Sequence, residues 1–334
     1  MKFIIAGLGS IGRRHLRHLA AAGGHDILLC RSGRGAPLEG ELADFPVETD
    51  LESALSSFRP DGVIISNPTA LHLDAAIPAA QAGCHILIEK PISHSMGRVD
   101  ALRAAVKDSG SRVLVGFQFR YHPGLRKIAA LLQDGQIGRP LSVRAHWGEY
   151  LPGWHPGEDY RAGYSARKDL GGGVILTLTH PLDYLRMLLG EVEALWAFAG
   201  QVSDLELDVE DTAEIGLRFA NGVIGSVHLD YNQRPPRHSL EIVCSGGTII
   251  WDNAAGGLRV YFAEENRWRE FALPEGFERD DLFRAQMDHF LEVVSGKADP
   301  LCTLEDGIRA QALALAAHRS AQTGELVKFD REGN

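Results

Sequence analysis

The chain has 334 residues, which is long enough for two domains of ordinary size. Apolar residues make up 45% of it and charged residues 23%, which is typical of a protein that folds around a hydrophobic core. The formal net charge of −10 argues against nucleic acid or an anionic membrane as a partner, and no apolar stretch approaches the roughly 20 residues that span a bilayer. We therefore expect a small molecule to be the main partner.

The cysteines and the N-terminus indicate the compartment. Four cysteines lie far apart without metal-ligand spacing, so we expect buried or free thiols, a cytoplasmic location and no bound metal. These are Cys30, Cys84, Cys244 and Cys302. The apolar start of the chain, Met1 to Ala6, is too short for the apolar region of a signal peptide, and glycines follow it at once. A buried strand explains this segment better.

The first third of the chain alternates short apolar runs with helical stretches. The pattern predicts strands at 2–6, 26–30, 46–48, 61–66, 85–88 and 112–117. It predicts helices at 11–22, 51–58, 72–82 and 96–108. Such alternation is typical of an α/β protein with a doubly wound parallel sheet.

A glycine-rich loop follows the first predicted strand, with the sequence Gly7-Leu8-Gly9-Ser10-Ile11-Gly12. In a dinucleotide site Gly7 permits the tight turn, Gly9 lets the backbone approach a pyrophosphate, and Gly12 allows close packing of helix and strand. The helix that opens near Ser10 offers free N–H groups to the phosphates. An ordinary turn would also contain glycines, but the surrounding strands and helices favour a nucleotide.

The end of the second predicted strand indicates the choice of cofactor. An acid there would bind the ribose hydroxyls of NAD, but the sequence is Cys30-Arg31-Ser32-Gly33-Arg34. Asp26 begins this strand and is badly placed for that role. Arg31 and Arg34 suit a 2′-phosphate, and Ser32 could donate to it, so we expect NADP, with NAD as the alternative. Arginines are also common in surface loops.

The pattern changes after about residue 121. A strand is predicted at 141–147, then a long polar loop, Gly171-Gly172-Gly173, and a helix at 174–189. Residues 192–273 indicate successive, mostly antiparallel strands, and helices are predicted at 282–295 and 304–321. We therefore expect domains at 1–121 and 122–334, with the last helix able to pack back on the first.

The helix predicted at 174–189 carries Thr177, His180 and Asp183 at a spacing of three, so they share one face. A histidine on an apolar helix is ordinarily a hydrogen-bonded core residue. His180, however, follows a glycine-rich turn and a polar loop, and its ordinary pKa of about 6.5 suits a proton acceptor.

The chain resembles the Gfo/Idh/MocA oxidoreductases, named after glucose–fructose oxidoreductase and inositol dehydrogenase. In the first half the resemblance is carried by the glycine loop with His15, by Asn67-Pro68-Thr69 with His72, and by Glu89-Lys90-Pro91. In the second half it is carried by Gly171-Gly172-Gly173, His180 and Asp183. The resemblance implies an N-terminal Rossmann domain and a C-terminal α/β domain whose large open sheet joins subunits into a homodimer or homotetramer.

The resemblance also implies roles for individual residues. Lys90 would face the substrate hydroxyl and the nicotinamide, Pro91 would follow a cis peptide bond, and His180 would remove the hydroxyl proton. The residues expected at the cofactor are Gly7, Gly9, Ser10, Ile11, Gly12, Arg31, Ser32, Arg34, Asn67, Pro68, His72, Glu89 and Lys90.

One position departs from the family pattern. Many relatives place an aspartate one turn before the histidine, where this chain has Thr177, or Leu176 in the longer family variant. Three alternatives follow: His180 works without its carboxylate, Asp183 takes the place of that carboxylate, or the chemistry differs.

Polar and aromatic residues before this helix indicate a substrate. Positive charge and stacking there would suit a sugar that bears a carboxylate or phosphate, including a nucleotide sugar. The candidates are Arg120, Tyr160, Tyr164, Arg167 and Lys168. Alternatively, these residues pair in a solvated loop with Glu158, Asp159 and Asp169.

We therefore expect an NAD(P)-dependent oxidoreductase that acts on a secondary hydroxyl or ketone of a sugar, sugar acid, polyol or nucleotide sugar. One alternative keeps the fold but uses tightly held NAD for redox-cycling hydrolysis or elimination of a glycoside. Another is a non-catalytic, cofactor-binding sensor, which the threonine at 177 motivates.

Overall fold

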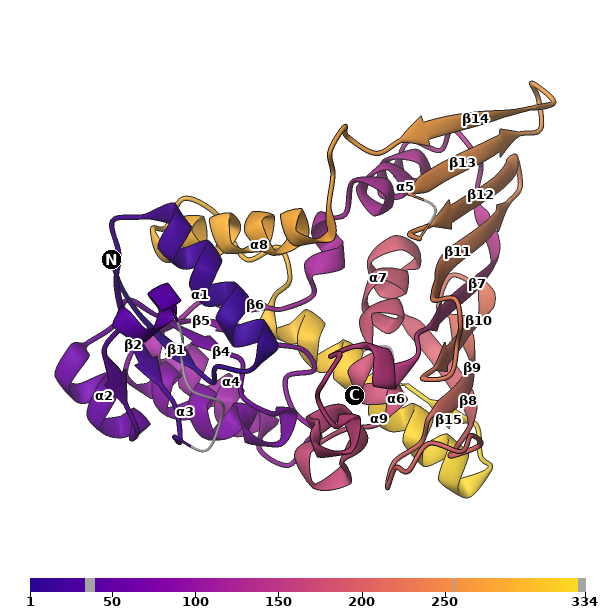
Figure 1. Ribbon diagram of the computed structural model, residues 1–334. Helices are drawn as coiled ribbons and strands as arrows, with labels where there is room; N and C mark the ends of the chain where they lie inside the picture. The colour runs from indigo at the N-terminus through magenta and orange to yellow at the C-terminus, as the bar shows by residue number, and fades with distance from the viewer. Residues whose placement is uncertain (34–39, 255, 330–334) are drawn as a thin grey trace. The chain divides into compact units, whose positions relative to one another are not determined.

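The computed structural model describes residues 1–33, 40–254 and 256–329 of the chain, which divides into two compact units (Figure 1). The N-terminal unit comprises residues 1–118 and 278–308. The C-terminal unit comprises residues 119–277 and the chain from 309 onward. The chain first passes from one unit to the other between residues 118 and 119, close to the boundary expected after residue 121.

The described residues of the N-terminal unit form a six-stranded parallel sheet in the order β3-β2-β1-β4-β5-β6. Its strands are β1 (Lys2–Ala6), β2 (Asp26–Cys30), β3 (Val47–Glu48), β4 (Gly62–Ile65), β5 (His85–Ile88) and β6 (Val113–Val115). The order reverses between β1 and β4, and open α/β sheets bind ligands at such a reversal. The predicted doubly wound sheet is confirmed.

Helices cover both faces of this sheet. α1 (Ser10–Ala22) and α8 (Arg279–Val294) lie side by side on one face (Figure 1). The other face is covered by α2 (Leu51–Phe58), α3 (His72–Gln81) and α4 (Val99–Ser109). Helix α1 turns Leu16 and Leu19 inward, and both are fully buried.

Residues 278–308 belong to the N-terminal unit, whereas the expected second domain includes all of residues 122–334. The reason is apolar packing by α8. The ring centroid of Phe290 lies 6.0 Å from that of Phe3 on β1, and that of Phe283 lies 6.3 Å from that of His15 on α1. Both phenylalanines are fully buried, and burying such a side chain contributes about 1.5–3 kcal/mol.

The described residues of the C-terminal unit form a nine-stranded sheet in the order β14-β13-β12-β11-β7-β10-β9-β8-β15. All neighbouring strands are antiparallel except β7 and β10, so the predicted mostly antiparallel sheet is confirmed. The strands are β7 (Pro140–Gly148), β8 (Val192–Gly200), β9 (Thr212–Phe219), β10 (Ile224–Asp230), β11 (Arg237–Cys244), β12 (Gly247–Asp252), β13 (Gly257–Phe262), β14 (Arg267–Ala272) and β15 (Val327–Lys328).

Helices lie against one face of this sheet: α5 (Pro123–Gln133), α6 (Val174–Thr177) and α7 (His180–Leu189) (Figure 1). No helix of the described chain covers the opposite face, which we call the open face. The sequence does not predict α5, which begins where the His122 ring nitrogen Nδ1 accepts a hydrogen bond from Gly124 N. Helix α9 (Leu304–Thr323) starts with a capping box formed by Thr303 and Asp306.

The single helix predicted at 174–189 is wrong, because the chain breaks between α6 and α7. Pro181 explains the break. A proline ring clashes with the carbonyl four residues earlier, here that of Thr177, and proline has no N–H to donate to it. Thr177 therefore ends one helix, while Pro181 and His180 lie in the first turn of the next.

Two further expectations can be compared with the structure. All four cysteines are buried free thiols, as predicted. Within the described ranges, none of the helices combines the length and the hydrophobicity needed to traverse a bilayer.

Candidate functional site

The glycine loop joins β1 to α1 at the reversal of the parallel sheet. Gly7 has a φ of 95°, and a Cβ there would lie 2.4 Å from Asn67 N, so only glycine fits. A Cβ on Gly12 would lie 2.1 Å from the Gly7 carbonyl oxygen. A Cβ on Gly9, by contrast, would meet nothing within 4 Å among the described residues. Gly7 and Gly12 are thus fixed by packing, whereas Gly9 faces open space.

The first turn of α1 adjoins that space. Gly9 is the N-cap, and no side chain of the described residues caps the helix, which leaves the N–H groups of Ser10 and Ile11 pointing out of its end. The Ser66 hydroxyl, just after β4, donates to the Gly7 carbonyl at 2.8 Å and holds the loop against the neighbouring strand. An uncapped helix start beside an open glycine fits a pyrophosphate.

The end of β2 carries the residues that the sequence links to cofactor choice. Arg31 N donates to the Glu48 carbonyl at 3.0 Å, and Ser32 follows directly. No acidic residue occupies positions 31–33, and Arg34 lies outside the described residues.

Glu89 follows β5 and is buried against α1. Its Oε1 lies 2.8 Å from His15 Nε2, and its Oε2 accepts a 3.3 Å hydrogen bond from Lys90 N. Burial alone would raise the pKa of Glu89, but the hydrogen bond and charge of His15 and the charge of Lys90 hold that pKa below its ordinary value. The carboxylate therefore fixes the backbone from which the Lys90 side chain projects.

His72 holds the other side of this segment. Its Nδ1 lies 2.8 Å from the Pro91 carbonyl oxygen, after the cis Lys90–Pro91 peptide, and its Nε2 lies 2.9 Å from that of Asn67. The ring is buried, and burial lowers its pKa although the two carbonyls favour the cation. Pro68, the residue after Asn67, precedes the turn Thr69–Leu71. The structure thus brings together the predicted residues that follow β4 and β5.

His180 lies in an aromatic cluster of the C-terminal unit. Its ring is 2% exposed, and its centroid lies 5.0 Å from that of Phe119 and 5.2 Å from that of Trp147. Trp147 in turn stacks on His238 at 4.1 Å. These flat side chains fix the plane of the imidazole, and the sequence analysis did not identify them because they lie on separate elements.

Asp183 forms a buried ion pair with Arg120. The Arg120 Nε donates to Oδ2 at 3.0 Å and its Nη2 to Oδ1 at 2.6 Å, and both side chains are at least nine-tenths buried. Such a bidentate pair fixes both partners. We expected Arg120 at the substrate, but in the structure its charge is balanced by Asp183.

Thr177 belongs to a separate polar group. Its hydroxyl lies close to that of Tyr231, which donates to the Ser165 carbonyl at 3.3 Å. Tyr231 is fully buried, and burial raises its pKa well above the ordinary value. Thr177 thus connects α6 to the end of β10.

Glu210 is a residue that the sequence analysis missed. Its Oε1 accepts a 3.0 Å hydrogen bond from Ile175 N in the first turn of α6, and a Cβ on Gly173 would lie 2.5 Å from the same oxygen. Burial raises the pKa of Glu210 to about 7. It lies in an acidic loop whose sequence carries no signal that singles it out.

The expected substrate-binding loop is rich in ion pairs. Arg167 donates to Asp169 at 3.0 and 2.6 Å, as the solvated-loop alternative proposes, and Lys168 N donates to Asp208 Oδ1 at 2.8 Å. The Tyr160 hydroxyl accepts from Glu206 N at 3.2 Å, and the Tyr164 carbonyl packs on Gly172. An open hollow of about 560 Å³ is lined by Arg161, Ala166, Arg167, Gln201, Glu206, Leu207 and Asp208.

Comparison with known families matches both units. Residues 1–117 match the model described as "Oxidoreductase family, NAD-binding Rossmann fold", and residues 125–250 match the "GFO/IDH/MocA C-terminal domain". Together these ranges span well over half of the chain.

Individual relatives match over nearly the whole length. The chain is 27% identical to a 1,5-anhydro-D-fructose reductase of Ensifer adhaerens over 324 residues, which covers 93% of each protein. It is 27% identical to a myo-inositol 2-dehydrogenase of Thermotoga maritima over an alignment of 348 positions, which covers 99% of each protein. A solved levoglucosan dehydrogenase in complex with NADH has the same fold, with a TM-score of 0.87, 23% identity and 98% of each chain covered.

Proposed function

The chain belongs to the Gfo/Idh/MocA family of oxidoreductases, and from that premise we propose that it transfers a hydride between NADP and a sugar-like substrate. The reacting group is a secondary hydroxyl or ketone of a sugar, sugar acid, polyol or nucleotide sugar. The observation that carries the proposal is Lys90, which follows β5 at the ligand-binding edge of the parallel sheet. Glu89 on one side and His72, through Pro91, on the other hold it there.

The glycine loop supplies the cofactor site. Gly9 and the first turn of α1, with Ser10 and Ile11, would receive the pyrophosphate, because they offer open space and N–H groups. The remaining predicted contacts come from Asn67, Pro68 and His72, which follow β4. When bound, the nicotinamide ring accepts or donates the hydride.

Arg31 and Ser32 favour NADP over NAD. They stand after β2, where an acidic side chain would otherwise bind the ribose hydroxyls. A guanidinium and a hydroxyl bind a 2′-phosphate, whereas an acid would repel it. We include Arg34 in this site on the sequence alone.

Lys90 and His180 have different roles in the proposed reaction. The Lys90 ammonium stabilises the negative charge that develops on the substrate oxygen, and His180 accepts the hydroxyl proton, with both roles reversed for reduction. Asp183 acts as a positioning residue, because its ion pair with Arg120 fixes the helix that carries His180. Thr177 positions α6 through Tyr231.

The polar hollow of the C-terminal unit favours a hydroxyl-rich substrate. Its wall carries donors and acceptors, because Arg161, Arg167, Glu206 and Asp208 line it and Glu206 pairs with Arg161. We propose that Tyr160, Tyr164, Arg167 and Lys168 contact the distal part of the substrate. To bind the substrate, Arg167 would exchange its ion pair with Asp169 for hydrogen bonds to the substrate.

A parallel screen with NAD and NADP tests the proposal. Sugars, sugar acids and polyols are offered to the full chain, and reduced cofactor is followed at 340 nm. We expect steady reduction with at least one substrate class and a higher kcat/KM with NADP. Copurified NAD that never exchanges, with a glycoside cleaved and no net reduction, would contradict it.

A further inference from the structure

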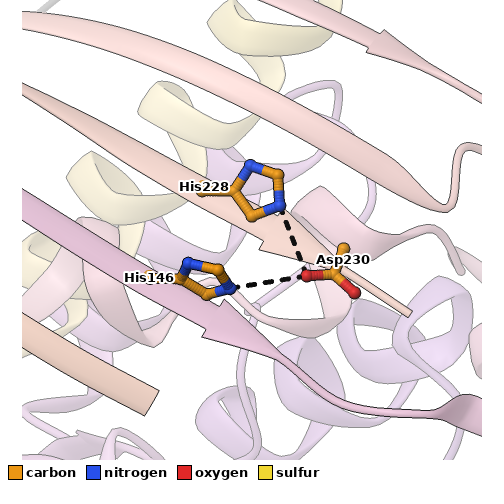
Figure 2. Close-up of side chains that lie close together, drawn as sticks. All are labelled: His146, His228 and Asp230. Atoms are coloured by element: carbon orange, nitrogen blue, oxygen red, sulfur yellow. Dashed lines mark ion pairs between the residues drawn. The ribbon is translucent and has the colours of Figure 1, made fainter. Parts of the chain in front are cut away.

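Three side chains of types that can bind a metal ion meet on the open face of the nine-stranded sheet (Figure 2). His146 on β7 and His228 on β10 are directly paired across the parallel strands. Asp230 lies two residues beyond His228, so its side chain is on the same face of the sheet. The strand pairing brings these residues together, although His146 is far from the other two in sequence.

Two of the distances between the ligand atoms are close to those around a tetrahedral zinc ion. Asp230 Oδ2 lies 3.3 Å from His228 Nε2 and 3.6 Å from His146 Nε2, and the ligand atoms all lie within 4.8 Å of one another. Zinc bonds of about 2.0–2.1 Å in tetrahedral geometry separate neighbouring ligands by about 3.3 Å. In Figure 2 both rings turn a nitrogen toward the same carboxylate oxygen.

The carboxylate is held with one oxygen aimed at the two rings. Asp230 Oδ1 accepts a 2.7 Å hydrogen bond from Asn232 N, whereas Oδ2 and His146 Nε2 are buried and make no hydrogen bond with a described residue. Side-chain exposure of Asp230 is only 7%. Gly148 makes room for this carboxylate, since a Cβ there would lie 2.2 Å from Oδ2. The negative charge on this buried oxygen is balanced either by protons on the two imidazoles that face it or by a bound cation.

A second carboxylate orients one of the rings. Glu214 on β9 lies 2.8 Å from His228 Nδ1, and its carboxylate can accept a hydrogen bond from that nitrogen. In the tautomer that carries its proton on Nδ1, the Nε2 lone pair is available to a metal ion beside Asp230. Carboxylate–imidazole–metal arrangements of this kind fix the tautomer of metal-bound histidines.

We propose that His146 Nε2, His228 Nε2 and Asp230 Oδ2 bind one divalent transition-metal ion of the zinc type, with water in the fourth position. Two imidazoles and a carboxylate are a ligand set that such ions prefer. The His146 and His228 side chains are 25% and 33% exposed in the single chain, so the site lies at the surface of the open face. The site departs from our expectation of no metal, which rested on spacing along the sequence.

Ion pairs between Asp230 and protonated imidazoles are the competing explanation. They would hold the same three residues together without any metal, and added zinc would then find no vacant lone pair. The two explanations therefore differ in whether the protein binds zinc.

Isothermal titration of the EDTA-treated full chain with ZnCl₂ near pH 7.5 tests the proposal. We expect one equivalent per chain, with affinity reduced at least tenfold in both His228→Ala and Asp230→Asn. Glu214→Gln should weaken binding about 10–100-fold. His155→Ala, which removes an exposed histidine of the same unit, is the matched control and should bind like the wild type.

Two further measurements make the result decisive. Circular dichroism shows whether each variant is folded, and substitution with Co²⁺ should give a visible absorption band that is lost in Asp230→Asn. The proposal would be overturned if the wild type does not bind zinc, or if folded His228→Ala and Asp230→Asn bind zinc as tightly as the wild type.

Discussion

Glu210 shows how one buried side chain couples the C-terminal unit to pH. Burial raises its folded-state pKa from 4.5 to about 7, so between these values the folded protein keeps a proton that the unfolded chain has lost. The free energy of unfolding therefore falls as pH rises through this window. Nearby His318, 3.6 Å away, adds little compensating charge because burial lowers its pKa.

Glu210→Gln should remove this pH dependence. The amide keeps an acceptor for Ile175 N but never ionises, so the variant should gain stability over the wild type between pH 4.5 and 7, by up to about 3 kcal/mol at 1.36 kcal/mol per pKa unit. Urea unfolding followed by Trp fluorescence across pH 5–8 measures the difference. Glu206→Gln, an exposed control, should show no such trend; a constant offset for Glu210→Gln would refute the assignment.

The Arg120–Asp183 pair makes a second prediction at the scale of single residues. Arg120→Met leaves a buried carboxylate without its bidentate partner, which costs about 3–5 kcal/mol in comparable cases. Urea unfolding should show this loss, and Arg120→Met with Asp183→Leu should recover part of it. If the double variant is no better than the single one, the arginine has a role outside this pair.

At the scale of elements, the turn between β1 and α1 separates packing from ligand binding. Gly12 lies against the Gly7 carbonyl, so Gly12→Ala forces backbone apart and should lower the melting temperature. The methyl group of Gly9→Ala meets open space, so this variant should keep the wild-type melting temperature. It should nevertheless bind NADPH more weakly, because the methyl group occupies the space proposed for the pyrophosphate.

Differential scanning fluorimetry and fluorescence titration with NADPH measure these two effects. Gly97→Ala is the control, because its φ is not positive and its nearest neighbour would be 4.0 Å away. Normal NADPH affinity in Gly9→Ala would place the cofactor elsewhere.

Elements with a local signature could be predicted from the sequence, and long-range arrangements could not. The parallel strands of the first unit and the hairpins of the second follow from apolar runs and turn residues that lie close together in the chain. Pro181 is itself a local signature, so the break between α6 and α7 is a feature that the sequence could have predicted. The amphipathic pattern of α8, by contrast, does not say which unit its apolar face contacts.

The candidate site divides in the same way. Gly7, Gly12 and Lys90 belong to short motifs with a local physical meaning. The Arg120–Asp183 pair and the His146, His228 and Asp230 cluster depend on contacts between separate elements, which spacing along the chain does not reveal.

At the scale of the whole molecule, the open face is the surface that we expect to join subunits. Trp196 and Phe198 on β8 are 42% and 71% exposed there and contact each other edge to face. Exposed aromatic neighbours on a sheet are typical of an interface. We expect light scattering to give a mass of two or four chains.

Trp196→Glu with Phe198→Glu should shift that mass toward one chain, because charge at the centre of an apolar interface is costly. Met96→Glu, at a comparably exposed apolar residue of the N-terminal unit, is the control. A wild-type protein that is monomeric at micromolar concentration would contradict this expectation.

Steady-state kinetics of Lys90→Ala, with NADPH affinity measured in parallel, tests the proposed function most directly. With the substrate found in the screen, kcat should fall by about 10²–10³-fold, since the ammonium stabilises charge in the transition state, while NADPH affinity stays near the wild-type value. Lys107→Ala, in the last turn of α4, controls for the loss of a lysine elsewhere in the same unit. Wild-type turnover by Lys90→Ala would contradict the account.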